Sequence, residues 1–243
     1  MVTTAKQRHR VTSYGQTGSK LLVAHGFGCD QNIWLPTVEL LQDNYQVLTF
    51  DWVGSGQVSD LPDDIERYET LAGHVDDLIE LIETLHLEHC FYVGHSVSGL
   101  IGCLAAIRRP DLFAQIIAIG ASPRYLNDPP DYYGGFTRTE VDQLMNMIAR
   151  NLVSWAGYLA PTVVNQPQRP ELAERLRKSF TSSNEQMLRQ FAAATFYCDH
   201  RRELSTVPVH VDLLYCDEDV IVPVEVAHYM AQRLPKSSLH KLD

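Results

Sequence analysis

The sequence lacks the segments that would carry a chain into or across a membrane. Its first ten residues contain no apolar stretch of the kind that a secretory signal needs. No apolar run approaches the roughly 18 residues of a membrane-spanning helix. The five cysteines are odd in number, irregularly spaced and without a C-x-x-C pair, so neither a disulfide framework nor a zinc site is expected. These absences predict a cytoplasmic protein with no membrane partner, no metal and no cofactor.

Positive charge is also scarce. The chain has 20 lysine and arginine residues against 30 aspartate and glutamate residues, so its formal net charge is −10. An acidic chain repels phosphate backbones and anionic lipid surfaces. The densest basic run, Lys6–Arg10, is short and typical of a solvated edge. We therefore expect no nucleic-acid partner.

Short apolar runs alternate with helical patterns in the first half of the chain. Four runs have the length and composition of buried strands: 21–24, 46–51, 90–93 and 116–120. Between them, residues 70–87 place apolar side chains at three- and four-residue steps, and 97–108 is an apolar segment that ends before Pro110. Strands that alternate with helices predict an α/β fold with a mostly parallel, doubly wound sheet covered on both faces.

The pattern changes in the middle of the chain and then returns. Between residues 122 and 202 strand-like runs vanish and helical periodicity dominates, in the ranges 140–164, 170–181 and 184–197. A strand at 209–215, a helix near 224–234 and a last strand from Ser238 follow. We predict one core formed by residues 1–121 and 203–243, with a helical insertion at 122–202.

Ser96 lies in the most informative local motif. The segment Val93–Gly99 reads Val-Gly-His-Ser-Val-Ser-Gly, follows a predicted strand and opens a predicted helix, which is the context of a G-x-S-x-G nucleophile turn. Such a turn would project the Ser96 hydroxyl into a pocket, and the free N–H of Val97 would face an oxyanion. Ser98 stands where a glycine is usual. A plain helix-capping serine is the alternative for the motif taken alone.

A second motif, His25-Gly26-Phe27-Gly28, follows an early strand. In this position the backbone N–H of Phe27 would be the other oxyanion donor, and the glycines would let the backbone approach the reacting carbonyl. We expect the His25 ring to satisfy backbone groups and not to transfer protons.

An acidic loop supplies the third element. Asp217, Glu218 and Asp219 follow a late strand, where a carboxylate could hold a histidine in its working tautomer. We choose Asp219, because the spacing Asp-x-x-x-Pro ends the loop and begins the next helix. Asp217 and a merely solvated acidic turn are the alternatives.

The histidine that should follow Asp219 is not evident. Only His228 and His240 remain, and His228 lies within a helix on its expected solvent side. His240 lies in the last strand, where strand geometry fixes the direction of its side chain, so it is a weak candidate for a general base.

Long stretches of the chain resemble a known family. These stretches are 25–31, 50–56, 94–98, 122–128 and 132–136. They are similar to the small α/β-hydrolases that include the bacterial sigma-B stress-regulator hydrolase (the Q-type regulator) and the plant karrikin and strigolactone receptors. The resemblance runs from end to end, which makes it far more specific than the serine motif alone.

The resemblance implies an α/β-hydrolase fold with a V-shaped lid of four helices over a deep apolar pocket. It implies Ser96 as nucleophile, Asp219 as the acid, and the backbones of Phe27 and Val97 as the oxyanion hole. The implied pocket lining is Tyr125, Phe136, Trp155 and Phe196, with Phe180 and Leu144 as weaker candidates. Burial in the lid's own core is the alternative for these side chains.

The resemblance also implies a histidine just past the last strand, followed by a final helix, and neither is in this sequence. A fragment of a longer chain is the expected explanation, because without that helix apolar surface and a sheet edge would be exposed. A gene that ends here is the alternative.

Three functions remain open. The first is hydrolysis of a small apolar ester, lactone or enol ether through Ser96. The second is a signalling receptor that binds such a compound and engages a protein partner, for which the resemblance implies a stress-pathway phosphatase. The third is an inactive binding module, because a serine without its base retains little rate.

Overall fold

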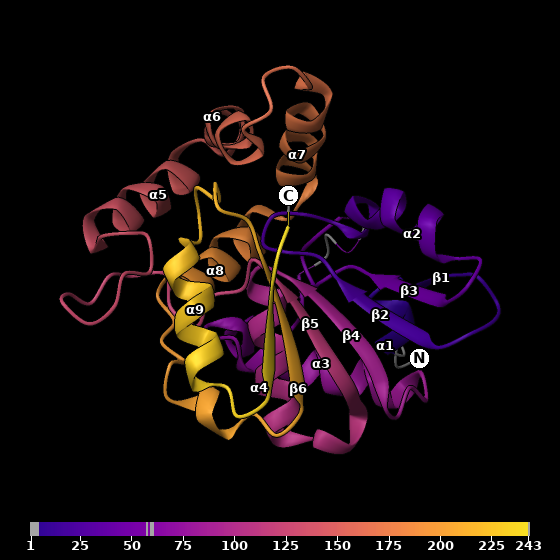
Figure 1. Ribbon diagram of the computed structural model, residues 1–243. Helices are drawn as coiled ribbons and strands as arrows, with labels where there is room; N and C mark the ends of the chain where they lie inside the picture. The colour runs from indigo at the N-terminus through magenta and orange to yellow at the C-terminus, as the bar shows by residue number, and fades with distance from the viewer. Residues whose placement is uncertain (1–4, 57, 59–60, 243) are drawn as a thin grey trace.

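The computed structural model describes residues 5–56, 58 and 61–242, and a seven-stranded sheet lies at its centre (Figure 1). The strand order is β1-β3-β2-β4-β5-β6-β7. The strands are β1 Thr12–Tyr14, β2 Lys20–Ala24, β3 Gln46–Phe50, β4 Cys90–His95, β5 Phe113–Ile119, β6 His210–Tyr215 and β7 Ser237–Lys241. Among the described residues, β1 pairs antiparallel with β3 and the other neighbours pair in parallel. The predicted mostly parallel sheet is therefore confirmed.

One face of the sheet is packed against three long helices. They are α3 Ala72–Thr84, α4 Val97–Arg108 and α9 Val224–Arg233. The apolar steps predicted in 70–87 become the buried face of α3, where Val75, Leu78 and Ile82 join the main core. From the sheet, Leu22, Tyr92 and Ile116 point into the same core. This packing holds β4 and α4, which carry the candidate serine, on a rigid base.

The opposite face of the sheet is covered in part, by the described helix that packs on it. Helix α2, Leu35–Leu41, packs there over β2 and β3 through Val38. Its seven residues span only about 10 Å, whereas seven strands about 4.8 Å apart span about 29 Å. Side chains of the remaining strands on this face are therefore only partly buried: Phe91, Val93, Ile117, Ile119 and Leu214. Both faces of the sheet thus carry helices, as the alternation of strands and helices predicts, and in the described part of the chain the cover on this face is partial.

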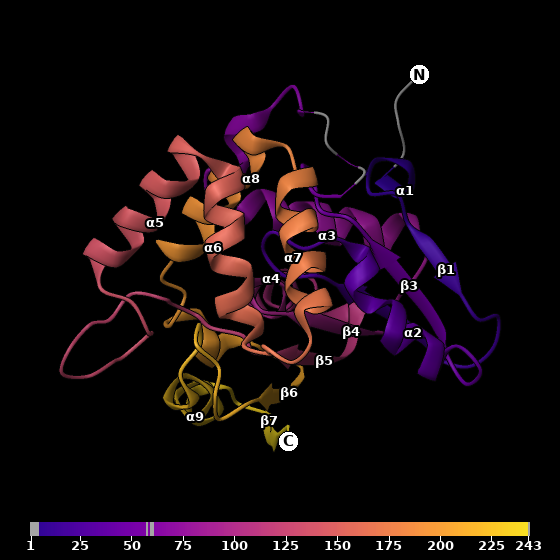
Figure 2. The same cartoon turned by 90° about the horizontal axis from the view of Figure 1, so that it is seen from above.

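Four helices lie above the carboxyl ends of the strands (Figures 1 and 2). These lid helices are α5 Arg138–Arg150, α6 Leu152–Val164, α7 Pro170–Ser182 and α8 Glu185–Phe196. Thr137 and Glu140 form a capping box at the start of α5. Asn151 divides the range predicted as 140–164 into α5 and α6, because its extended backbone ends α5 while its side chain accepts from the Ser154 N–H.

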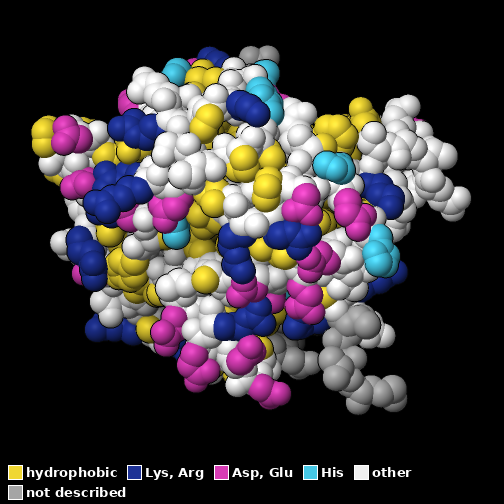
Figure 3. Space-filling view, turned by 90° about the horizontal axis from the view of Figure 1, so that it is seen from below, with side chains coloured by type: hydrophobic (Ala, Val, Ile, Leu, Met, Phe, Trp, Pro, Cys, Tyr) yellow, Lys and Arg dark blue, Asp and Glu magenta, His cyan; other side chains and the backbone are white. Residues whose placement is uncertain are grey.

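Short elements complete the fold. They are α1 Ala5–Arg8 and the 3₁₀ turns η1 Gln31–Trp34, η2 Ile65–Tyr68, η3 Pro110–Leu112 and η4 Glu203–Thr206. In the described part of the chain, no helix combines the length and the apolar character needed to cross a bilayer. On the face seen from below, basic and acidic side chains are interspersed, so no continuous basic surface lies there (Figure 3).

Candidate active site

Ser96 occupies a strained turn between strand β4 and helix α4. Its backbone has φ +56° and ψ −129°, a region that residues with a side chain rarely adopt. The turn is possible because Gly94 has no side chain: a Cβ there would lie 2.5 Å from the Ser98 carbonyl carbon. The Ser96 N–H donates to the Ile119 carbonyl over 2.7 Å, which fixes the turn to strand β5. The sequence prediction of a strand–turn–helix context at this serine agrees with this geometry.

The loop after β2 comes close to this turn. A Cβ on Gly26 would lie 3.1 Å from the Ser96 Cβ and 2.8 Å from the His95 Nδ1, so only glycine permits the approach. Among the residues the structure describes, the N–H groups of Phe27 and Val97 have no hydrogen-bond acceptor. Two unsatisfied donors beside a serine hydroxyl are the arrangement that an oxyanion hole requires.

His25 is held by hydrogen bonds at both ring nitrogens and at its carbonyl, and it fixes the loop that follows β2. The Trp52 N–H donates to His25 Nε2 over 3.2 Å, so Nδ1 carries the proton and donates to the Gly26 carbonyl over 2.9 Å. The His25 carbonyl accepts from the Ser98 hydroxyl at 2.6 Å and from the Trp52 indole N–H at 3.1 Å. With its ring and carbonyl satisfied, His25 has the structural role expected from the sequence.

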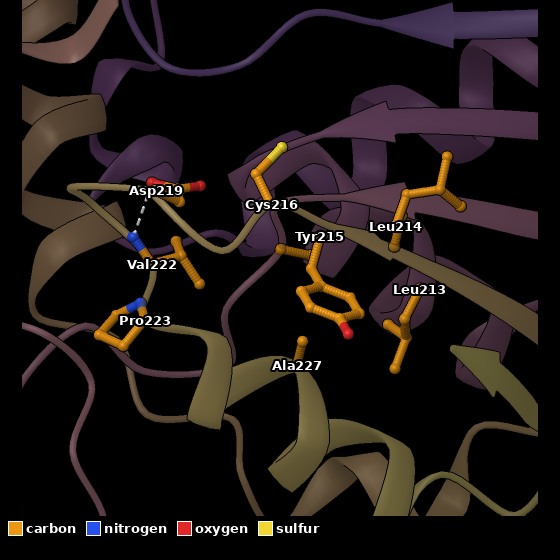
Figure 4. Close-up of a pocket in the computed structure, with 11 residues that line it drawn as sticks. Leu213, Leu214, Tyr215, Cys216, Asp219, Val222, Pro223 and Ala227 are labelled. Carbon is orange, nitrogen blue, oxygen red and sulfur yellow. Dashed lines mark hydrogen bonds between the residues drawn. The ribbon is translucent and has the colours of Figure 1, made fainter. Parts of the chain in front are cut away.

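Asp219 lies on the loop that follows strand β6 (Figure 4). Its Oδ1 accepts from the N–H groups of Ile221 and Val222 over 2.8 and 3.0 Å, and these bonds fix the carboxylate at the start of the next turn. Asp217, the alternative candidate, instead pairs with the Lys241 ammonium over 2.5 Å. Both carboxylates line the cavity that contains Ser96, but the Asp217 charge is already paired with Lys241, whereas Asp219 has no cationic partner among the described ion pairs.

The candidate histidines lie elsewhere. His240 Nε2 is 3.1 Å from Asp212 Oδ1 on the partly exposed face of the sheet, and His228 is exposed on α9 beside Tyr215. His95 precedes the serine, and its buried Nδ1 has no hydrogen-bond partner. Across the described ranges, neither Ser96 nor Asp219 is hydrogen-bonded to a histidine.

A cavity of about 1050 Å³ opens at Ser96 beneath the lid helices. Phe27, Tyr125, Phe180 and Phe196 line it, together with aliphatic side chains of α6 and α7. Trp155 and Phe136 do not line it: Trp155 packs against Phe180 at 4.6 Å between ring centroids, and Phe136 against Phe196 at 5.8 Å. Leu144, a weaker candidate, is buried outside the lining as well. Direct ligand contact by the four predicted residues stays a prediction.

Some residues of the cavity wall are not among those predicted from the sequence. Leu172 and Leu176 of α7 line it two turns and one turn before Phe180, and Ile33 and Pro36 line it from the segment after β2. The i, i+4, i+8 spacing on α7 was a usable signal, because it places the three side chains on one face of the helix. No comparable periodicity marks Ile33 and Pro36.

Tyr125 brings a second hydroxyl to the serine. Its side chain is 1% exposed, and its hydroxyl lies 3.4 Å from Ser96 Oγ. Burial raises the pKa of the Tyr125 phenol above its ordinary value, so the group stays protonated and can donate a hydrogen bond at neutral pH.

Tyr125→Phe is expected to lower the rate of Ser96 acylation by at most about tenfold, because one long neutral hydrogen bond contributes only about 1 kcal/mol. The measurement is the second-order rate constant for reaction with an aryl ester, compared with wild type. A loss beyond a hundredfold would contradict this view and give the phenol a part in proton transfer.

Several histidines are buried in a neutral state. Burial lowers the pKa of His9, His25 and His95, and it lowers the pKa of His74 to about 3. In the unfolded chain a histidine has a pKa of about 6.5. Below that value the unfolded state binds protons that the folded state excludes, so the free energy of unfolding falls as the pH is lowered. The raised pKa of buried Asp77 acts in the opposite direction.

We therefore expect the free energy of unfolding to be lower at pH 5.0 than at pH 7.5. His74 alone accounts for about 2 kcal/mol at pH 5.0, that is, about 1.36 kcal/mol for each pH unit below 6.5. Urea unfolding at the two pH values measures the difference, and His74→Phe should reduce it. Equal or greater stability at pH 5.0 would contradict the neutral burial of these histidines.

Fold and site together define a class of protein. A doubly wound parallel sheet that presents a serine on a strained strand-to-helix turn, under inserted helices, is the architecture of α/β-hydrolases. The family model of the alpha/beta hydrolase fold matches residues 20–243, so the chain belongs to that family.

Similar proteins give a finer comparison. The chain is 36% identical to the karrikin insensitive 2 receptor CA of Petunia hybrida, over 96% of this chain and 86% of the receptor. It is 38% identical to the strigolactone esterase RMS3 of Pisum sativum, over 93% of this chain and 85% of the esterase. A solved hydrolase from Oleispira antarctica matches with a TM-score of 0.94 and 35% identity, over 98% of this chain and 88% of that one. The resemblance to karrikin and strigolactone receptors is thus confirmed.

Proposed function

We propose that this protein hydrolyses a small, predominantly apolar ester or lactone through Ser96. The observation that carries the proposal is the position of Ser96, on a strained turn that opens into the cavity of about 1050 Å³, beside the free N–H groups of Phe27 and Val97. Cavities of this size hold small organic molecules, and an aromatic lining favours apolar ones.

The chemistry follows from this arrangement. Ser96 Oγ attacks the ester carbonyl carbon, and the N–H groups of Phe27 and Val97 hold the negative charge on the carbonyl oxygen. The alcohol group then leaves with a proton, and water releases the acid from Ser96. The serine proton needs a base. In α/β-hydrolases that base is a histidine held by a loop carboxylate, for which Asp219 has the position here, and none of the described histidines is hydrogen-bonded to Ser96.

The test is hydrolysis of p-nitrophenyl acetate by the full-length protein, followed by labelling of Ser96 with a fluorophosphonate. We expect release of p-nitrophenol and a single labelled serine. If no p-nitrophenol is released and no serine is labelled while an apolar ligand still binds in the cavity, the hydrolase proposal is wrong. The protein is then an inactive binding module.

A signalling role is the second candidate. The similar proteins named above include a receptor as well as an esterase. In addition, the lid helices expose the apolar side chains Met147, Val153 and Tyr158, which are 41%, 61% and 67% accessible. Such side chains offer a protein partner, of the stress-pathway phosphatase kind implied by the resemblance, a surface next to the ligand cavity. A binding assay with such a phosphatase, with and without ligand, tests this role, and no binding in either state would exclude it.

A further inference from the structure

Phe27 connects the oxyanion loop to the lid helices. Its ring lies 5.9 to 6.3 Å, between centroids, from four other aromatic rings, those of Trp155, Phe180, Phe191 and Phe196. The same residue provides one of the two proposed oxyanion donors through its N–H. Because ring and N–H are joined to one Cα, packing that fixes the ring also restrains the backbone that carries the donor.

One of the four rings is held from the core. Phe191 of α8 stacks on His74 of α3, with ring centroids 4.1 Å apart and an interplanar angle of 20°. His74 is 0% and Phe191 2% exposed. Trp52 and Tyr68 meet the same imidazole at steep angles, with centroids 5.5 and 5.1 Å away. The imidazole therefore has a fixed plane, and Phe191 lies against it.

Hydrogen bonding does not explain this histidine. Neither ring nitrogen of His74 has a partner among the described residues, although both are buried. A buried polar atom without a partner lowers stability, so an apolar side chain would suit the position better for folding alone. Burial lowers the pKa of His74 to about 3, so the ring is neutral and stacks without a charge. What His74 provides is a flat surface for Phe191.

Helix α8 transmits this contact because two contacts fix the turn that precedes position 191. A Cβ on Gly54 would lie 2.2 Å from the Met187 Cβ, so the helix lies directly on the Gly54 backbone. The Gln190 side chain donates to the Ile65 carbonyl over 2.7 Å. Phe191 is thus placed by a fixed helix, with His74 behind it and Phe27 in front of it.

We propose that His74 is a positioning residue of the Ser96 site, which acts through Phe191 to fix Phe27 and the direction of its N–H. The proposal rests on the proposed function, since it assigns that N–H to the developing oxyanion. His74 itself does not touch the reacting atoms.

The experiment compares His74→Leu with His74→Phe in the full-length protein. Both variants remove the unpartnered nitrogens, but only phenylalanine keeps a flat ring against Phe191. Two quantities are measured: the rate constant for Ser96 acylation by p-nitrophenyl acetate, and the dissociation constant of p-nitrophenyl methyl ether, an unreactive probe. Thermal unfolding shows whether each variant is folded.

We expect His74→Leu to lower the acylation rate about tenfold, less than the 10²- to 10³-fold loss of a whole oxyanion donor. Affinity for the methyl ether should change by less than about twofold, because neither His74 nor Phe191 lines the cavity and the other lining residues keep their places. His74→Phe should restore the rate. An unchanged rate in His74→Leu, an equal loss in both variants, or a parallel loss of ether affinity would overturn the proposal.

A second measurement separates this proposal from the proposed function. The backbone amide chemical shift of Phe27 does not depend on catalysis, and it should change in His74→Leu and return to the wild-type value in His74→Phe. If wild type is not acylated at all, the hydrolase proposal fails, and this chemical shift alone decides whether His74 positions Phe27. An equal chemical shift in wild type and both variants would overturn the positioning role.

Discussion

Replacing Ser96 with alanine is expected to abolish ester hydrolysis while leaving ligand binding in the cavity intact. Loss of a serine nucleophile lowers turnover on the order of 10⁴- to 10⁶-fold, because the covalent route disappears and only binding and the oxyanion hole remain. Alanine removes one oxygen whose described contact is a long hydrogen bond to Tyr125, so the fold should not change. The measurement is p-nitrophenyl acetate turnover beside the affinity for p-nitrophenyl methyl ether.

Ser98→Ala is the matched control for this variant. Ser98 Oγ donates to the His25 carbonyl over 2.6 Å and accepts from the Trp52 indole N–H over 3.0 Å, and it lies within α4. Its loss should lower the free energy of unfolding by about 1–3 kcal/mol, because buried groups lose their partner. Fluorophosphonate should still label Ser96 in this variant. If Ser96→Ala retained turnover, the nucleophile would have to be sought elsewhere in the cavity.

Local sequence was sufficient to find the residues at the ends of the strands. Ser96 directly follows a strand, Phe27 and Asp219 lie in the loops just after theirs, and the carboxyl ends of parallel strands meet at one edge of a sheet. A short motif therefore determines both the local turn and its place in the fold. The structure brings these three residues around a single cavity, as that rule implies.

The composition of the cavity wall could not be obtained in the same way. Trp155 and Phe136 are as apolar as Tyr125 and Phe196, yet they support lining residues without lining the cavity themselves. Hydrophobicity indicates that a side chain is buried, but not whether it faces a cavity or another side chain. That difference depends on the angles at which the lid helices cross.

The aromatic support of Phe27 shows a second limit. His74 belongs to a helix of the first half of the chain and Phe191 to the last lid helix, so no periodicity within either segment reveals that they stack. Similarly, the incomplete cover on one face of the sheet follows from the length of α2, which the residue pattern did not define. Contacts between segments that are far apart in the sequence can be identified only in the folded structure.

Asp219→Asn is expected to lower the acylation rate of Ser96 about 10⁴-fold with almost no loss of stability, as for the carboxylate of a serine triad. Asparagine keeps an oxygen that can accept from the N–H groups of Ile221 and Val222, but it loses the charge that holds a histidine in its working tautomer. Asp219→Ala should show a similar rate loss together with a free energy of unfolding lower by about 1–2 kcal/mol. Single-turnover kinetics and urea unfolding measure the two effects.

Asp217→Asn provides the comparison that decides between the two acidic candidates. Asp217 pairs with the Lys241 ammonium at the sheet edge, where both side chains are about half exposed. An exposed pair of this kind contributes roughly 0–1 kcal/mol, so the Asp217→Asn rate should remain within about threefold of wild type. Because the two variants make the same chemical change two residues apart on one loop, a large loss in Asp217→Asn with a small one in Asp219→Asn would reverse the assignment. The opposite pattern would make Asp219 the carboxylate on which acylation depends.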